Sequence, residues 1–214
     1  MAPELAVQLA LLILTLAMFF AVLKLPKQAL TTKLRSRNRS TVQSTRHLAQ
    51  ASSLLDRART SPHRAQSQAQ AKNALAEAEK ALSLSPRDPA AHILKALALD
   101  LMDRRSSALR SLDLALSPPC VKSLSGRERG DALLKRAELK LAVNRRRRID
   151  SAVQDLVESV RLSDGDGESK ALCLLGQCYE LKGMKEPARE AYEKALRVEP
   201  GSVVARQGLD RLGV

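Results

Sequence analysis

The sequence has very few aromatic side chains. Phe, Trp and Tyr make up 2% of the 214 residues, and Trp does not occur. Because strands favour aromatic and β-branched residues, this composition speaks against a β-sandwich. The core must consist mainly of Ala, Leu and Val, and Ala and Leu are strong helix formers. The composition therefore predicts an all-α protein of closely packed helices.

Cysteines are also few, and no motif pairs them. Cys120, Cys173 and Cys178 contain no C-x-x-C pair, and their odd number indicates neither a disulfide framework nor a zinc site. We interpret them as small buried residues in a reducing compartment.

The sequence lacks the combinations of residues that mark common catalytic sites. His47, His63 and His92 are far apart, no Gly-rich phosphate loop is present, and no Ser-His-Asp order suggests itself. The acidic run 164–168 fails as a calcium loop, because Ser169 stands where the sharp-turn Gly belongs. We therefore expect no enzyme, no metal, no cofactor and no small-molecule substrate.

One long apolar run stands near the start of the chain. Residues 5–23 carry no charge, and as a helix they would span about 28 Å, close to the roughly 30 Å hydrocarbon core of a bilayer. We expect residues 1–23 to form a transmembrane signal-anchor. A cleaved signal peptide is the alternative, but Glu4 stands where positive residues would be expected. Lys24 and further basic residues follow, within a basic juxtamembrane linker at 24–44.

This charge asymmetry predicts the orientation and the location of the protein. Positive residues stay on the cytosolic side, so the C-terminal domain should face the cytosol. The expected localisation is a single-pass membrane protein that contacts the membrane through residues 5–23. The endoplasmic reticulum is the default membrane, and the outer envelope of mitochondria or plastids is the alternative.

An internal repeat predicts the architecture of the remaining chain. Residues 74–86 and 188–200 share one pattern: Glu-Lys-Ala recurs at 79–81 and 193–195, and both segments end in Pro. A repeat of this kind indicates stacked helical hairpins.

The clearest unit covers residues 169–202. Its apolar and small residues follow helical spacing on two facing helices. They are Leu172, Leu175, Gly176, Tyr179, Ala188, Tyr192, Ala195 and Pro200. This pattern resembles the tetratricopeptide repeat (TPR), a 34-residue helix–turn–helix unit, with Leu172 in place of the Trp and Tyr192 in place of the Phe.

Weaker matches extend the resemblance along the chain. Residues 67–86 match the second helix of a repeat, 89–121 form a second match, and 129–164 form a degenerate unit. A short helix at 202–213 would cap the stack. The resemblance implies a TPR-like solenoid of three to four repeats over residues 45–214, preceded by the single transmembrane helix.

The resemblance implies protein binding, because stacked hairpins create a concave surface. We expect a membrane-anchored adaptor or scaffold that presents this groove to the cytosol. The alternatives are an organelle-surface co-chaperone or import receptor and a structural subunit of a membrane complex. The candidate groove residues are Ile93, Leu97, Lys135, Glu138, Lys170 and Gln177. None is Asn, so they do not match the carboxylate clamp of TPR domains that bind chaperone tails.

The net charge of +13 is uneven. Residues 101–150 alone carry +7, and this basic stretch suggests an acidic partner segment. Its sharpest part, Arg145–Arg148, is interpreted first as a solvated turn between helices and second as a site for an acidic partner. Nucleic acid is not expected, because both Tyr residues are placed in a hairpin core.

Overall fold

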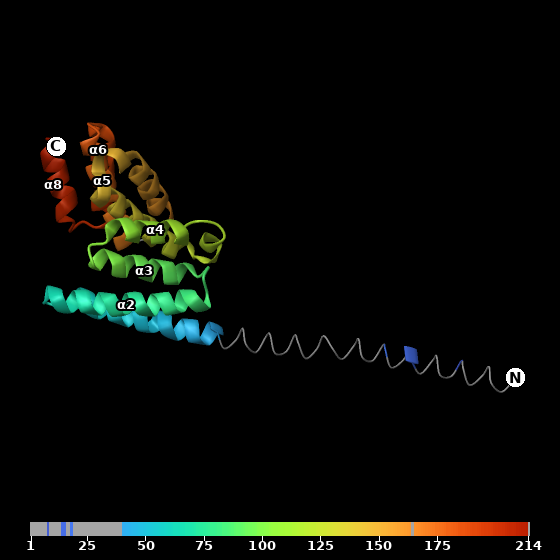
Figure 1. Ribbon diagram of the computed structural model, residues 1–214. Coiled ribbons are helices and arrows are strands. Elements are labelled where there is room, and N and C mark those ends of the chain that lie inside the picture. Colours follow the sequence, from blue (N-terminus) through green and yellow to red (C-terminus); the bar gives the residue numbers. More distant parts are fainter. Residues whose placement is uncertain (1–7, 9–13, 16–17, 19–39, 164, 214) are drawn as a thin grey trace.

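The described part of the chain is built from helices. The computed structural model describes residues 8, 14–15, 18, 40–163 and 165–213 (Figure 1). Residues 40–60 are helical, and the elements that follow are α2 (Arg64–Leu84), α3 (Pro89–Leu101), α4 (Arg105–Ala115), the 3-10 helix η1 (Cys120–Ser123), α5 (Gly126–Leu162), α6 (Asp166–Leu181), α7 (Lys185–Val198) and α8 (Val203–Leu212). No strand occurs in these ranges, so the expected all-α fold is confirmed.

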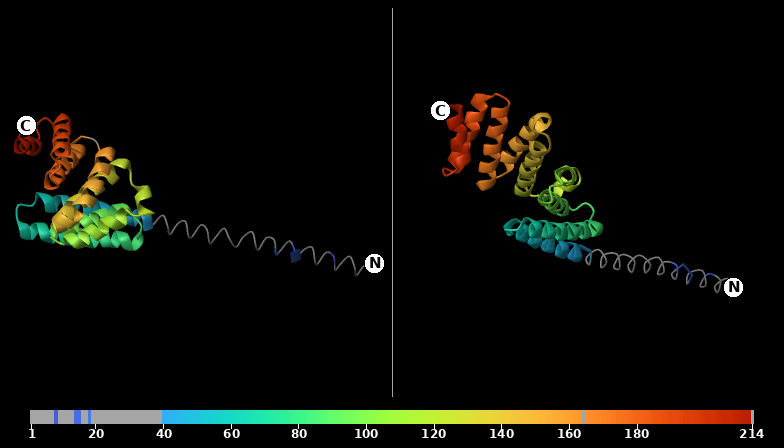
Figure 2. Two further views of the ribbon diagram at one scale, coloured as in Figure 1. Left: turned by 90° about the horizontal axis from the view of Figure 1, so that it is seen from above. Right: turned by 60° about the vertical axis from the view of Figure 1, so that its left-hand side comes forward.

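Neighbouring helices pair into hairpins that stack in chain order (Figure 2). The first hairpin joins residues 40–60 to α2, and the second joins α3 to α4. Ser44, which the sequence analysis placed in the linker, lies in a helix and is buried against α2. The last hairpin joins α6 to α7, and α8 packs on both of them as the expected cap.

The degenerate unit is a hairpin formed by the two halves of α5. Asn144 alone leaves the helical conformation, with φ −157° and ψ 91°. The chain reverses there, and contacts join the two halves of α5. The Ser159 hydroxyl donates to the Gly130 carbonyl at 2.9 Å, and Arg136 donates to Asp155. The expected long turn is therefore a single residue. Arg145–Arg148 fall in the first helical turn after it, where the Asn144 side chain accepts from the Arg147 N–H at 3.1 Å.

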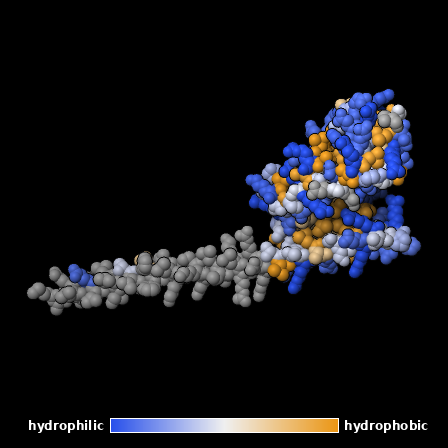
Figure 3. All heavy atoms as spheres, turned by 180° about the vertical axis from the view of Figure 1, so that it is seen from behind, coloured by the Kyte–Doolittle hydropathy of each residue, from blue (hydrophilic) through white to orange (hydrophobic). Residues whose placement is uncertain are grey.

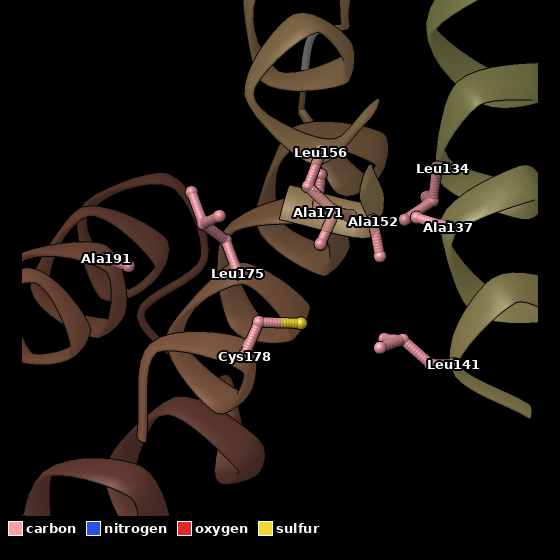
Figure 4. Close-up of a cluster of buried hydrophobic side chains, with 9 residues drawn as sticks. All are labelled: Leu134, Ala137, Leu141, Ala152, Leu156, Ala171, Leu175, Cys178 and Ala191. Atoms are coloured by element: carbon pink, nitrogen blue, oxygen red, sulfur yellow. The ribbon is translucent and has the colours of Figure 1, made fainter. Parts of the chain in front are cut away.

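Small apolar residues fill the contacts between hairpins. Figure 4 shows one cluster in which both halves of α5, α6 and α7 converge. Its members are Leu134, Ala137, Leu141, Ala152, Leu156, Ala171, Leu175, Cys178 and Ala191. Apolar side chains also lie between the helical layers on the face seen in Figure 3, while hydrophilic side chains project outward. Alanine lets helix backbones approach closely, so this core is packed with few aromatic rings.

The last hairpin holds the buried Tyr192 ring between two glycines. Tyr192 is fully buried. A Cβ added at Gly176 would lie 2.6 Å from the ring, and one added at Gly208 of α8 would lie 2.4 Å from it. Gly176, predicted to permit close helix approach, thus makes room for the Tyr192 ring itself. The Tyr192 hydroxyl donates to Glu180 at 2.9 Å.

The membrane topology expected from the sequence is not supported. Among the residues that the structure describes, no helix is both long enough and apolar enough to cross a bilayer. The 21 residues of α2 and the 37 residues of α5 have sufficient length, but both helices carry charged side chains throughout. The prediction of a single-pass membrane protein with a cytosolic C-terminal domain is therefore corrected. Its proposed anchor, residues 5–23, lies outside the described residues except for Gln8, Leu14, Thr15 and Met18.

Candidate functional site

A groove of about 740 Å³ runs across the first helices of the hairpins. Its walls come from residues 40–60, α3, the first half of α5 and the start of α6. Five of the six residues expected from the sequence line it, namely Ile93, Leu97, Lys135, Glu138 and Lys170. Gln177 lies in an adjoining hollow of about 460 Å³, which shares Glu138 with the groove. The predicted residues therefore lie along one surface.

Helix α3 supplies the apolar wall of the groove. Its start is set by Asp88, whose side chain accepts from the Ala90 N–H at 3.0 Å, and by Pro89 at the first helical position. Residues four apart on a helix lie on the same face, so Ile93 and Leu97 both point into the groove.

Sequence reasoning missed the contribution of the first hairpin. Thr45, Leu48, Ala49 and Ser52 line the groove from the helical residues 40–60. Their spacing of three and four residues is a helical-face signal that could have identified them. The irregular spacing of this first unit prevented the transfer of positions from the clear repeat at 169–202. Leu94, Leu124 and Leu134 also line the groove and were not predicted.

Lys135 is held in the groove by two carboxylates. Its Nζ lies 2.8 Å from Asp100 Oδ2 and 2.9 Å from Glu138 Oε2. Burial lowers the pKa of Lys135, but hydrogen bonds to Asp100 and Glu138 outweigh this effect, so the pKa is raised. Its positive charge is therefore already neutralised. Lys170, by contrast, makes no ion pair with residues 40–163 or 165–213.

Two acidic side chains add negative charge to the same groove. Glu128 accepts from the Ser125 N–H at 2.8 Å and from the Ser125 hydroxyl at 2.7 Å, and these bonds hold the pKa of Glu128 below its usual range. Asp131 lies one helical turn further along α5. The groove thus combines apolar walls with charges of both signs.

The charged residues of the adjoining hollow are Glu138, Glu180 and Arg145. Glu180 is bound by Arg211 at 2.9 Å and by the Tyr192 hydroxyl. Burial raises the pKa of Glu180, but these hydrogen bonds outweigh it and the pKa is lowered. Glu138 is bound by Lys135. Arg145 remains without an ion pair to any described residue.

The basic stretch of residues 101–150 is not one exposed patch. Arg136 and Lys140 bind the buried Asp155, and Arg129 binds Glu158 at 3.3 Å. These pairs lie between helices and neutralise much of the positive charge that the sequence shows. The run Arg145–Arg148 has no such partners within the described ranges.

Two of the histidines outside the groove have partners in a neighbouring helix or loop. His47 Nδ1 lies 2.6 Å from Glu77 of α2, and His92 Nε2 lies 3.1 Å from the Pro86 carbonyl. All three cysteines are buried, and burial raises the pKa of the Cys178 thiol to about 11. Across the described residues, no group of three or more His, Cys, Asp or Glu side chains could hold a metal ion.

Residues 169–202 match the sequence model of the tetratricopeptide repeat family. The fold is similar to the crystal structure of MamA, with 18% identity, a TM-score of 0.61, and coverage of 79% of this chain and 80% of that chain. It is also similar to pilF of Pseudomonas aeruginosa, with 18% identity, a TM-score of 0.58, and coverage of 83% and 77%. Among curated proteins, none matches the sequence.

A third similar structure comes from a larger assembly. The APC/C hetero-tetramer Cut9–Hcn1 shares 17% identity with this chain at a TM-score of 0.56, over 66% of this chain and 26% of that chain. At these identities the likeness shows the fold. The chain thus folds as an all-helical TPR-like solenoid, and its residues 169–202 match the tetratricopeptide repeat.

The groove should bind the C-terminal tail of a heat-shock chaperone weakly or not at all. A tail carboxylate needs several converging donors. Here Lys135 is already bound by Asp100 and Glu138, and Glu128 and Asp131 repel a carboxylate. Fluorescence anisotropy with a labelled chaperone-tail peptide would measure this. A micromolar or tighter dissociation constant would contradict the expectation.

Proposed function

We propose that the protein is a protein-binding scaffold whose groove holds an amphipathic segment of a partner protein. The observation that carries the proposal is the groove of about 740 Å³, which draws its walls from four stacked hairpins. A surface built from successive repeats is long enough to contact an extended or helical segment along its length. The apolar side chains of Ile93, Leu97 and Leu134 supply the area that a partner can bury.

The charges of the groove favour a helical partner segment with one apolar face. Lys170 forms no ion pair with the part of the chain that the structure describes, and Glu128 and Asp131 place two carboxyl groups along the same walls. A segment with an apolar stripe flanked by both signs of charge would match this surface, which is the helix-in-groove mode of recognition. A strongly acidic or strongly basic segment would be repelled by one part of these walls.

Site-specific photo-crosslinking tests the proposal. A photoreactive phenylalanine at Ile93 should give a discrete partner adduct in extracts of the source cells. The same residue at Val157, which is 43% exposed on the second half of α5 and lies outside the groove, should give none. Leu97→Glu should remove the Ile93 adduct, because it places a carboxylate among Glu128, Asp131 and Glu138.

The control variant changes the same residue type on another surface. Leu114 is 53% exposed on α4 and does not line the groove, so Leu114→Glu should leave the adduct intact. Circular dichroism checks that both variants remain helical. The position of the adduct decides the outcome: equal adducts from Ile93 and Val157, or an adduct that survives Leu97→Glu, would place the partner elsewhere.

A further inference from the structure

Four consecutive arginines occupy the first helical turn after Asn144. The side chains of Arg145, Arg146 and Arg147 are exposed, and Arg148 is half-buried. None of the four guanidinium groups forms an ion pair or a hydrogen bond with the residues that the structure describes. Five other cations of α5 have carboxylate partners, namely Arg129, Lys135, Arg136, Lys140 and Arg161, whereas Arg127 forms no ion pair with the described residues.

This placement is unfavourable for the isolated chain. The first turn of a helix carries the positive end of the helix dipole and favours acidic rather than basic side chains. Four guanidinium groups in that turn repel one another as well as the dipole. An anionic ligand against the turn would be attracted by both, and arginine is the residue best suited to hold carboxylates.

The arginine run borders the proposed binding surface. Arg145 lines the hollow of about 460 Å³ together with Leu141, Leu174 and Gln177, and the hollow joins the groove at Glu138. We propose that Arg145–Arg148 bind an acidic stretch of the partner segment, so that apolar residues lie in the groove and several Asp or Glu residues follow at the α5 turn. The inference rests on the proposed function of the groove and adds the charge pattern of the segment it takes.

The surroundings of the run favour a peptide over the other polyanions. A nucleic acid would need aromatic platforms for stacking, and Tyr179 and Tyr192 are half-buried and buried in the last hairpin. A membrane would need a flat surface with apolar side chains that insert. Here the neighbouring apolar residues Leu141 and Leu174 line a concave hollow, which admits a chain rather than a planar bilayer.

Two matched fluorescent peptides test the inference by anisotropy with the full-length protein. Both carry the same nine-residue amphipathic helix, with Leu on one face and Lys and Glu on the other, followed in one peptide by six Glu and in the other by six Gln. The Glu peptide should bind about tenfold tighter at 0.15 M salt. Each exposed ion pair should raise the affinity about twofold, and four such pairs together give an effect of about this size. The difference in affinity should shrink at 1 M salt, because the Debye length is then about 3 Å and exposed ion pairs are screened.

The variant in which Arg145–Arg148 are all changed to Gln should lose this preference and bind both peptides alike. A control removes the same number of charges from exposed positions away from the groove. It carries Lys72→Gln, Arg87→Gln, Arg110→Gln and Lys122→Gln and should keep the preference. Because the arginine run disfavours its helix, the Arg→Gln variant should melt no lower than the wild type, which separates lost binding from lost folding.

The outcomes distinguish the two proposals. Equal wild-type binding of both peptides would overturn the acidic contact and leave the groove function standing. Binding of neither peptide would contradict the amphipathic occupant and the acidic contact together. Vesicles of phosphatidylcholine with one-quarter phosphatidylserine serve as a third probe. If the arginine run is required for vesicle binding while the peptides are not distinguished, its ligand is a membrane surface and the inference is wrong.

Discussion

Replacing Asp155 with alanine is expected to lower the free energy of unfolding by about 3–5 kcal/mol, because it leaves the partly buried Lys140 without a carboxylate and Arg136 with only the exposed Asp113. The Asp155 side chain is 6% exposed and accepts from Arg136 Nη2 at 2.6 Å, while its second oxygen lies 2.7 Å from Lys140 Nζ. The side chains of Arg136 and Lys140 are themselves only 20% and 12% exposed. The three residues bridge the halves of α5, so their loss should loosen the hairpin. Urea denaturation followed by circular dichroism measures the change.

Asp113 provides a matched control for Asp155. It contacts the same Arg136 at 3.3 Å, but its side chain is 52% exposed. Exposed ion pairs contribute little, so Asp113→Ala should cost less than about 1 kcal/mol. Equal effects of the two substitutions would mean that the buried bridge between Arg136, Lys140 and Asp155 does not stabilise the α5 hairpin.

The hairpins themselves could be predicted from the sequence, because the relevant signals are local. Helical spacing, Gly183 with its φ of +74° in the last turn, and prolines between units all lie within one repeat. The same spacing, transferred from the clear repeat, puts Ala152, Leu156 and Ser159 at the positions that Ala188, Tyr192 and Ala195 have in it, and all three are fully buried.

The Asp155 bridge could not be predicted in this way. Arg136 and Lys140 lie four residues apart on one face of α5, but their partner lies on the other half of the helix. Their meeting depends on the register of the hairpin, and that register depends on a turn of one residue at Asn144. The sequence suggested a turn that also included the four arginines. An error of a few residues there shifts every pair between the halves of α5.

The candidate groove shows the same division between local and long-range information. Ile93 and Leu97 were found from positions within a repeat, and the structure places both in the groove. The distribution of unpaired charge on this surface could not be predicted from the sequence, because it depends on ion pairs between helices. Lys135 is neutralised by Asp100 of α3, thirty-five residues away in the chain. The uneven net charge therefore suggested a broad basic patch, whereas five of its cations are paired with carboxylates, and Arg145–Arg148 are the longest run in it without an ion pair to the described residues.

Replacing Tyr192 with alanine is expected to destabilise the last hairpin by about 3–5 kcal/mol, the cost of removing a buried aromatic ring and leaving a cavity. The ring lies between Gly176 of α6 and Gly208 of α8, so it fills the space between the repeat and its cap. Tyr192→Phe keeps the ring and loses only the hydroxyl group, which donates to Glu180 and accepts a longer bond from Arg211, and should cost about 1 kcal/mol. Thermal unfolding and urea denaturation compare the two variants.

A second substitution tests whether the two glycines are required by the ring. A Cβ at Gly208 would lie 2.4 Å from Tyr192 Cζ, so Gly208→Ala should overpack the contact and cost about 1–3 kcal/mol in the wild type. In the Tyr192→Ala background the ring is absent and the added methyl group enters the cavity, so the same change should cost little or stabilise. The double variant should then be more stable than the sum of the single effects predicts. Additive effects would instead mean that the backbone of α8, and not the space for the Tyr192 ring, requires Gly208. The cap would then be held in place by contacts other than this ring.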